Sequence, residues 1–141
     1  MSVISTSEVT SLLSPINAFL HCETPQSWID EAQKEENLRV ILTDHLICEL
    51  KAAQSAMYLL RRYVADEETS KVLLGWLKPY EDFTYRHEGD WQSLNTKHLS
   101  KNVFNTEGLD PFKKDMLDKM VMLIKEELHH FYQVLEIIHE L

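Results

Sequence analysis

The stretch Lys125–Val134 reads K-E-E-L-H-H-F-Y-Q-V and places two carboxylates and two imidazoles inside an apolar helical pattern. Residues three apart lie on one face of a helix, so Glu127 can act with His130, and Glu126 with His129. The apolar residues at matching positions are Met116, Met120, Leu123, Val134 and Ile137. The polar face carries Lys125, Gln133, Glu136 and Glu140. The pattern therefore predicts that Glu127 and His130 point inward.

A second long helix is predicted from about residue 37 to residue 65. Its apolar stripe consists of Leu42, Leu46, Ala53, Ala56, Leu60 and Tyr63. Glu49 falls on this stripe. A lone Glu there usually lies at a helix edge or pairs with a basic residue, but the inward Glu127 and His130 favour metal ligation. His45, one turn before Glu49, could be a further ligand, although we favour a supporting or core role for it.

The composition indicates one helical domain, because 141 residues contain only three glycines and four prolines. Ferritin-like carboxylate proteins use an inward Glu-x-x-His pair twice around two metal ions, with one Glu from each of two other helices. Glu49, Glu127 and His130 are half of that set. Glu136 and His139 share the spacing, but Glu136 lies on the polar face. We expect an all-α, ferritin-like four-helix bundle, incomplete in this chain, which supplies the first pair of ligand-bearing helices.

The middle of the chain, residues 66–110, has a less regular pattern. A helix is predicted over Glu67–Leu77, ended by Lys78 and Pro79. His87, Glu88 and Asp90 resemble a small metal site in composition only, and we expect a solvated loop. The aromatic residues of the segment predict that part of it folds back on the helices; they are Trp76, Phe83, Tyr85 and Trp91.

The net charge of −9 argues against a broad nucleic-acid-binding surface, because phosphate neutralisation needs clustered Lys and Arg. A local basic patch stays open. The sequence lacks an apolar run of about 20 residues and an apparent secretion signal, so we expect a cytoplasmic protein without membrane contact. Cys22 and Cys48 have no metal-binding spacing and are predicted to be free, buried thiols.

Three runs carry a resemblance to a known family: S-P-I-N-A-F-L-H-C-E-T-P-Q-S-W-I-D-E-A (14–32), D-H-L-I-C-E-L-K-A-A-Q-S-A (44–56) and E-E-L-H-H-F-Y-Q-V-L (126–135). They resemble the N-terminal half of the MiaE family, the tRNA methylthio-isopentenyladenosine hydroxylases. The resemblance is poor over residues 66–110, where an insertion lengthens the link between the ligand helices.

The resemblance implies a di-iron monooxygenase that hydroxylates the isopentenyl group of a hypermodified adenosine in tRNA. Its cofactors would be two Fe ions, with O2 as co-substrate and an external electron donor. The family's first-half ligands fall on Glu49, Glu127 and His130. The remaining ligands would come from an absent second half or from a second copy of this chain in a homodimer. We place the tRNA contact on Arg61, Arg62, Lys97 and Lys101.

Two alternatives belong to other classes of protein. A ferritin- or rubrerythrin-like protein would handle iron or peroxide and would need no RNA-binding surface. A metal-free helical interaction module would bind no iron. Metal uptake and tRNA binding separate these alternatives from the hydroxylase.

Overall fold

The computed structural model describes residues 6–99, 104 and 106–141, and within these residues all regular structure is helical. The all-α class predicted from the sequence is confirmed. The α-helices are α1 (Thr6–Phe19), α2 (Gln26–Ala32), α3 (Glu35–Tyr63), α4 (Glu67–Glu81) and α5 (Pro111–Glu140). A π-helical turn, Asp82–Arg86, and two 3₁₀ turns, Trp91–Leu94 and Thr96–His98, follow α4.

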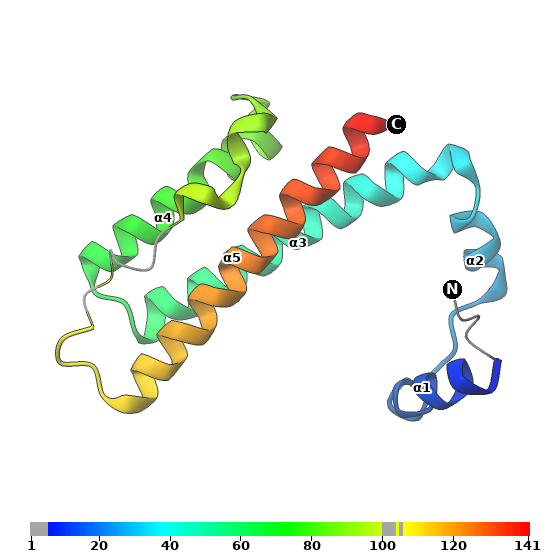
Figure 1. The fold of residues 1–141 in the computed structure, drawn as a ribbon, viewed down its shortest axis with the longest axis horizontal. Coiled ribbons are helices and arrows are strands. Elements are labelled where there is room, and N and C mark those ends of the chain that lie inside the picture. The colour runs from blue at the N-terminus through cyan, green and yellow to red at the C-terminus, as the bar shows by residue number, and fades with distance from the viewer. Residues whose placement is uncertain (1–5, 100–103, 105) are drawn as a thin grey trace. The chain divides into compact units, whose positions relative to one another are not determined.

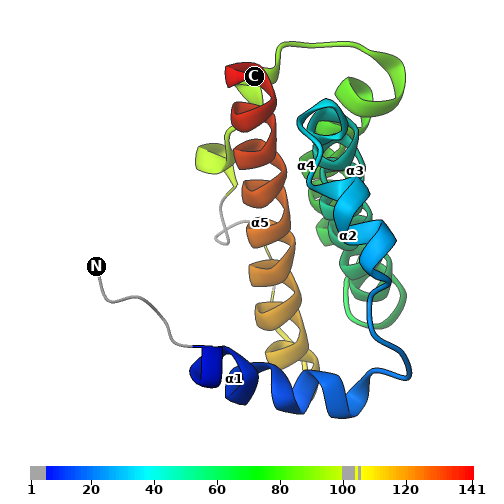
Figure 2. The same cartoon turned by 90° about the vertical axis from the view of Figure 1, so that its right-hand side faces the viewer.

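The two long helices, α3 and α5, run antiparallel to each other, and α4 runs back along α3 (Figures 1 and 2). Gln54 on α3 donates a hydrogen bond of 2.7 Å from Nε2 to Oε1 of Glu81 on α4. This bond fixes the register of the two helices at one point. Because α3 and α5 are the helices on which the sequence places Glu49, Glu127 and His130, their pairing brings these side chains to a common interface.

One apolar core joins α3, α4 and α5. Leu50 and Leu60 on α3 and Leu73 on α4 are fully buried, as are Ile124 and Phe131 on α5. Their burial follows the helical periodicity of the sequence, since each lies three, four or seven residues from another buried position. Burying a side chain of this size stabilises the fold by roughly 1.5–3 kcal/mol before entropic costs.

Aspartate caps begin α4 and α5. Asp66 accepts a hydrogen bond of 2.7 Å from the backbone N–H of Thr69, and Asp110 accepts one of 2.9 Å from that of Lys113. Such caps satisfy backbone donors that the first turn of a helix leaves unpaired. Pro111 directly after Asp110 costs no hydrogen bond at this position. The cap and the proline together explain why α5 begins at Pro111.

The predicted end of α4 is wrong, because the helix continues through Pro79 to Glu81. A proline inside a helix removes one hydrogen bond and crowds the carbonyl four residues earlier, but here the residues on either side, Leu77 and Tyr80, are buried in the core and offset this cost. The π-helical turn that follows ends at His87, which has a positive φ of 57°. The change of direction therefore occurs well after Pro79, at a left-handed residue.

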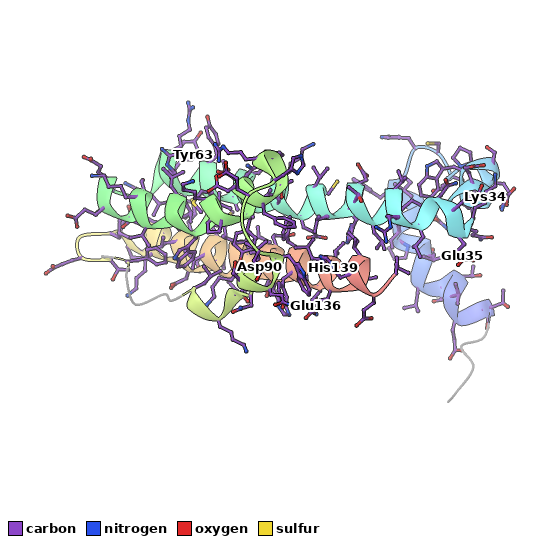
Figure 3. The ribbon with its side chains drawn as sticks, turned by 90° about the horizontal axis from the view of Figure 1, so that it is seen from above. Lys34, Glu35, Tyr63, Asp90, Glu136 and His139 are labelled. Atoms are coloured by element: carbon purple, nitrogen blue, oxygen red, sulfur yellow. The ribbon has the colours of Figure 1, made fainter. Side chains whose placement is uncertain are left out.

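The segment after α4 folds back on α5, as its aromatic residues predicted. The buried hydroxyl of Tyr80 donates a hydrogen bond of 2.8 Å to the carbonyl oxygen of Leu94, and burial raises the pKa of Tyr80 to about 12. Trp91 stacks on His139, with 4.4 Å between ring centroids. Asp90, Glu136 and His139 accordingly lie in one region over the C-terminal half of α5 (Figure 3).

Residues 1–38 form a separate unit, whose described helices α1 and α2 have no buried residue. Both cysteines are free, as predicted, but the prediction that they are buried is wrong, because both are exposed. Cys22 lies in the link between α1 and α2, and Cys48 lies on α3 next to Glu49. Among the described residues, no helix is long and apolar enough to cross a membrane.

Candidate metal centre

Glu49, Glu127 and His130 come together where α3 and α5 face each other. Each offers one ligand atom, and these three atoms all lie within 4.8 Å of one another. A single metal ion with bonds of about 2 Å to oxygen and nitrogen fits between donors at such separations. No other group of three His, Cys, Asp or Glu side chains with this geometry occurs in the part of the chain that the structure describes.

The carboxylate of Glu49 is the central member of the group. Its Oε1 lies 3.0 Å from Nε2 of His45, and its Oε2 lies 3.6 Å from Nδ1 of His130. The side chain of Glu49 is only 12% exposed. At 3.6 Å the contact to His130 is too long for a good hydrogen bond. The two side chains thus face one another across a space instead of being joined directly.

Glu127 is held close to Glu49, and this proximity changes its acidity. The hydrogen bond to Glu49 is the main reason that the pKa of Glu127 rises to about 7, followed by burial and the negative charge of Glu49. His130 opposes this rise, and Glu126 adds to it. Two carboxylates that share a site resist being ionised together, so one of them retains a proton until a cation replaces it.

The site lies at an open edge of the α3–α5 pair. His130 is 51% exposed, and its apolar neighbours on the same stripe of α5, Leu123 and Ile137, are 37% and 47% exposed. The fully buried stripe of α5 is the neighbouring one, which contains Leu117, Val121, Ile124, Leu128, Phe131 and Leu135. Glu127 and His130, the pair predicted to point inward, therefore lie at the edge of the core of this chain, with His130 half exposed to solvent.

Other residues that the sequence singled out lie elsewhere. Glu126 and His129 are exposed and outside the three-residue group. His45 is also exposed, so the core role considered for it is wrong, and it contacts Glu49 of the site. His87, Glu88 and Asp90 are exposed in the loop after the π-helical turn, as predicted, and form no such group.

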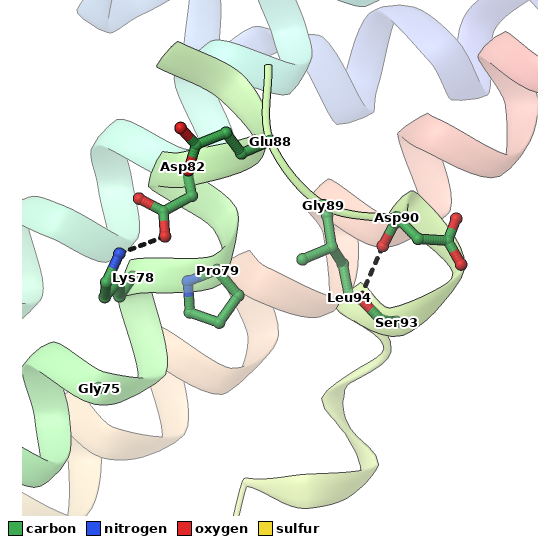
Figure 4. A pocket seen from close by; sticks show the side chains of 9 residues that line it. All are labelled: Gly75, Lys78, Pro79, Asp82, Glu88, Gly89, Asp90, Ser93 and Leu94. Atoms are coloured by element: carbon green, nitrogen blue, oxygen red, sulfur yellow. Dashed lines mark hydrogen bonds and ion pairs between the residues drawn. The ribbon is translucent and has the colours of Figure 1, made fainter. Parts of the chain in front are cut away.

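A cavity of about 450 Å³ lies between α4 and the loop that follows it (Figure 4). Its lining residues are Gly75, Lys78, Pro79, Asp82, Glu88, Gly89, Asp90, Ser93 and Leu94. Ion pairs with Lys78 and Arg86 engage Asp82. The hydrogen bond from Lys78 is the main reason that the pKa of Asp82 lies below its usual range. The cavity shares no residue with the candidate metal centre.

Arg62, one of the residues predicted to contact tRNA, lies beside two tyrosines, which the sequence did not predict. Arg61, Arg62 and Lys97 are exposed, whereas Lys101 lies outside the described residues. The guanidinium of Arg62 donates a hydrogen bond of 2.7 Å to the hydroxyl of Tyr58 and lies 5.6 Å from the ring centroid of Tyr63. The four-residue spacing between Tyr58 and Arg62 was the available signal, because such residues adjoin on a helix.

Two carboxylates and one imidazole form a donor set that suits iron, manganese or zinc. The site does not contain a nucleophile paired with a base, which makes metal binding the chemistry that its described residues support best.

Comparisons with known proteins point in the same direction. The model of the family described as tRNA-(MS2IO6A)-hydroxylase (MiaE) matches residues 11–141. A Salmonella typhimurium protein named tRNA 2-(methylsulfanyl)-N(6)-isopentenyladenosine(37) hydroxylase is 52% identical over 128 residues, which cover 89% of this chain and 47% of that relative. A Pseudomonas putida protein of the same name is 43% identical over 53 residues, covering 38% of this chain and 25% of that protein. The chain thus spans about half the length of the Salmonella relative, and no solved structure matches it significantly.

Proposed function

The chain belongs to the MiaE family of tRNA hydroxylases, and on this basis we propose that it supplies half of the metal centre of an enzyme that hydroxylates a hypermodified adenosine in tRNA. The acceptor would be the isopentenyl group, as in the names of the two relatives. One observation carries the proposal: Glu49, Glu127 and His130 place their ligand atoms within 4.8 Å of one another. As expected from the sequence, the proposed enzyme works in the cytoplasm.

We propose that these three residues are ligands of a di-iron centre. Carboxylate oxygens suit oxidised iron and imidazole nitrogen suits both oxidation states, so the donors present fit this metal. When bound, iron would supply the activation of O2, with electrons from an external donor. The three residues would hold the metal against α3 and α5, which are rigid helices joined by a common core.

In this proposal, Glu127 loses a proton when the metal binds. Because its pKa is about 7, part of the population holds a proton at neutral pH. Metal ligation requires the ionised carboxylate, so the proton must leave as the metal enters. The repulsion between the carboxylates of Glu49 and Glu127 is then relieved by the positive charge between them.

Apolar residues around the three donors would exclude water from the reacting group. Leu46 and Ala53 lie about one turn before and after Glu49, and Leu128 and Phe131 directly follow Glu127 and His130. All four side chains are buried. A dry surround of this kind protects a reactive oxidant from side reactions.

The remaining ligands of a two-metal site must come from other polypeptide. A two-metal carboxylate site uses two Glu-x-x-His pairs and two further carboxylates, of which this chain supplies one pair and Glu49. The open edge beside His130, with Leu123 and Ile137 half exposed, is where the complement would pack. We propose that it is a second half of the enzyme or a second copy of this chain.

The activity is tested with tRNA that carries the methylthio-isopentenyl modification. The chain would be supplied with iron(II), O2 and a chemical reductant, and digested tRNA would be examined by mass spectrometry for a nucleoside with one added oxygen. The same reaction with Glu127→Ala serves as the control and should yield none. Absence of the product with an iron-loaded wild-type chain would contradict activity of this chain by itself. Binding of iron with loss of peroxide, and without tRNA binding, would favour the rubrerythrin-like alternative.

A further inference from the structure

We infer that His45 is a positioning residue for Glu49, which it orients toward the metal without being a ligand. This role rests on the proposed metal centre. The observation behind it is the 3.0 Å contact between Nε2 of His45 and Oε1 of Glu49. Both residues are on α3 and four positions apart, so the helix itself maintains the contact.

The two oxygens of Glu49 have different neighbours, one of them His45 and the other a proposed metal ligand. Oε1 lies 3.0 Å from Nε2 of His45, whereas Oε2 lies 3.6 Å from Nδ1 of His130, on the side of the other donors. A glutamate side chain has several rotatable bonds, and fixing one oxygen removes most of its rotational freedom. With His45 in place, the second oxygen is held where a metal would meet it.

His45 itself stays outside the donor set. The three ligand atoms within 4.8 Å of one another belong to Glu49, Glu127 and His130. The side chain of His45 is 56% exposed, compared with 12% for Glu49. Partners of this kind orient metal ligands and typically change metal affinity about 10- to 100-fold when removed.

The test is a titration of the purified chain with Co²⁺, whose visible absorbance reports the number and kind of ligands. His45→Ala removes the donor, and His45→Gln keeps an N–H at nearly the position of Nε2. His129→Ala is the matched control, because it removes an exposed histidine that lies outside the donor group. We expect about 10- to 100-fold weaker Co²⁺ binding for His45→Ala, with near wild-type affinity and an unchanged spectrum for the other two variants.

Three results would overturn the role of His45. Equal losses in His45→Ala and His45→Gln, with an altered spectrum, would make His45 a ligand. Wild-type affinity in His45→Ala would show that Glu49 needs no support, while the proposed centre itself would stand. Failure of the wild-type chain to bind Co²⁺ would contradict the centre and the role together. Circular dichroism verifies folding, and Ala at an exposed helical position favours the helix.

Discussion

The carboxyl groups of Glu127 on α5 and Glu49 on α3 lie with their ligand atoms within 4.8 Å of each other, and hydrogen bonding between them is the main cause of the rise in the pKa of Glu127 to about 7. The two residues are therefore linked across the helix interface by a proton that a metal ion would replace. The pH dependence of the stability of the metal-free chain follows from this link.

The stability of the metal-free chain should fall as pH rises from about 4.5 to about 7. In this window the folded state keeps a proton on Glu127, whereas the unfolded state, with the ordinary Glu pKa of 4.5, releases it. Stability decreases with pH wherever the folded state binds more protons. A pKa difference of one between the two states corresponds to about 1.4 kcal/mol. Because the site is open to solvent on one side, screening reduces the effect, and the loss should be on the order of 1–3 kcal/mol.

The matched variant is Glu127→Gln, which keeps a hydrogen-bond donor toward Glu49 at every pH. Thermal unfolding should give similar midpoints for both proteins at about pH 5 and a higher midpoint for the variant at about pH 8. Parallel pH profiles for the two proteins would mean that Glu127 does not retain a proton.

Tyr80→Phe should destabilise the chain by about 1–3 kcal/mol, because it leaves the carbonyl of Leu94 without its buried partner. Denaturant unfolding measures this loss. Tyr85→Phe is the control and should change stability by less than about 0.5 kcal/mol, since Tyr85 is half exposed. If both substitutions have the same effect, the Tyr80 hydroxyl does not anchor the segment after α4.

Neutralising Arg61, Arg62, Lys97 and Lys101 should weaken tRNA binding and flatten its salt dependence. Each phosphate that the protein no longer neutralises should reduce the slope of log K against log salt by about one. The control neutralises Lys71 and Lys119, which already pair with Glu67 and Asp115. Binding that survives the substitution of all four patch residues would place the tRNA-binding surface elsewhere.

The isolated chain should form a dimer that takes up iron. A second copy about a two-fold axis would contribute its own Glu49, Glu127 and His130, giving four carboxylates and two imidazoles, and would cover the half-exposed Leu123 and Ile137. Sedimentation with and without iron(II) measures the oligomeric state. A monomer, or a dimer that binds no iron, would rule out a site shared between two copies.

Helical periodicity predicted the parts of this structure that depend on burial. The spacing of apolar residues predicted the two long helices and placed Glu127 and His130 on a different face from Glu126 and His129, and His130 is half exposed on that face. The path through Pro79 was missed because a proline usually ends a helix, whereas the burial of Leu77 and Tyr80 outweighs the cost of the proline in α4. The exposure of Cys48 was missed because composition says nothing about which face a single residue occupies.

Helical periodicity could not predict which side chains contact each other at the site. The sequence placed Glu49 on an inward stripe, but its two oxygens have different neighbours, His45 and His130, and this division depends on side-chain rotamers. The stripe with Leu123 and Ile137 was expected to face a core, and it proved half exposed in this chain. A stripe of apolar residues predicts that one face of a helix will be buried, but it does not identify which polypeptide segment buries that face.

The measurement that tests the metal centre most directly is an anaerobic iron(II) titration of the wild-type chain and of two pairs of alanine variants. The proposal predicts saturable uptake by the wild type, loss of uptake in Glu127→Ala and His130→Ala, and near wild-type uptake in Glu126→Ala and His129→Ala. Equal losses in both pairs, or no uptake by the wild type, would contradict the assignment of Glu49, Glu127 and His130 as iron ligands.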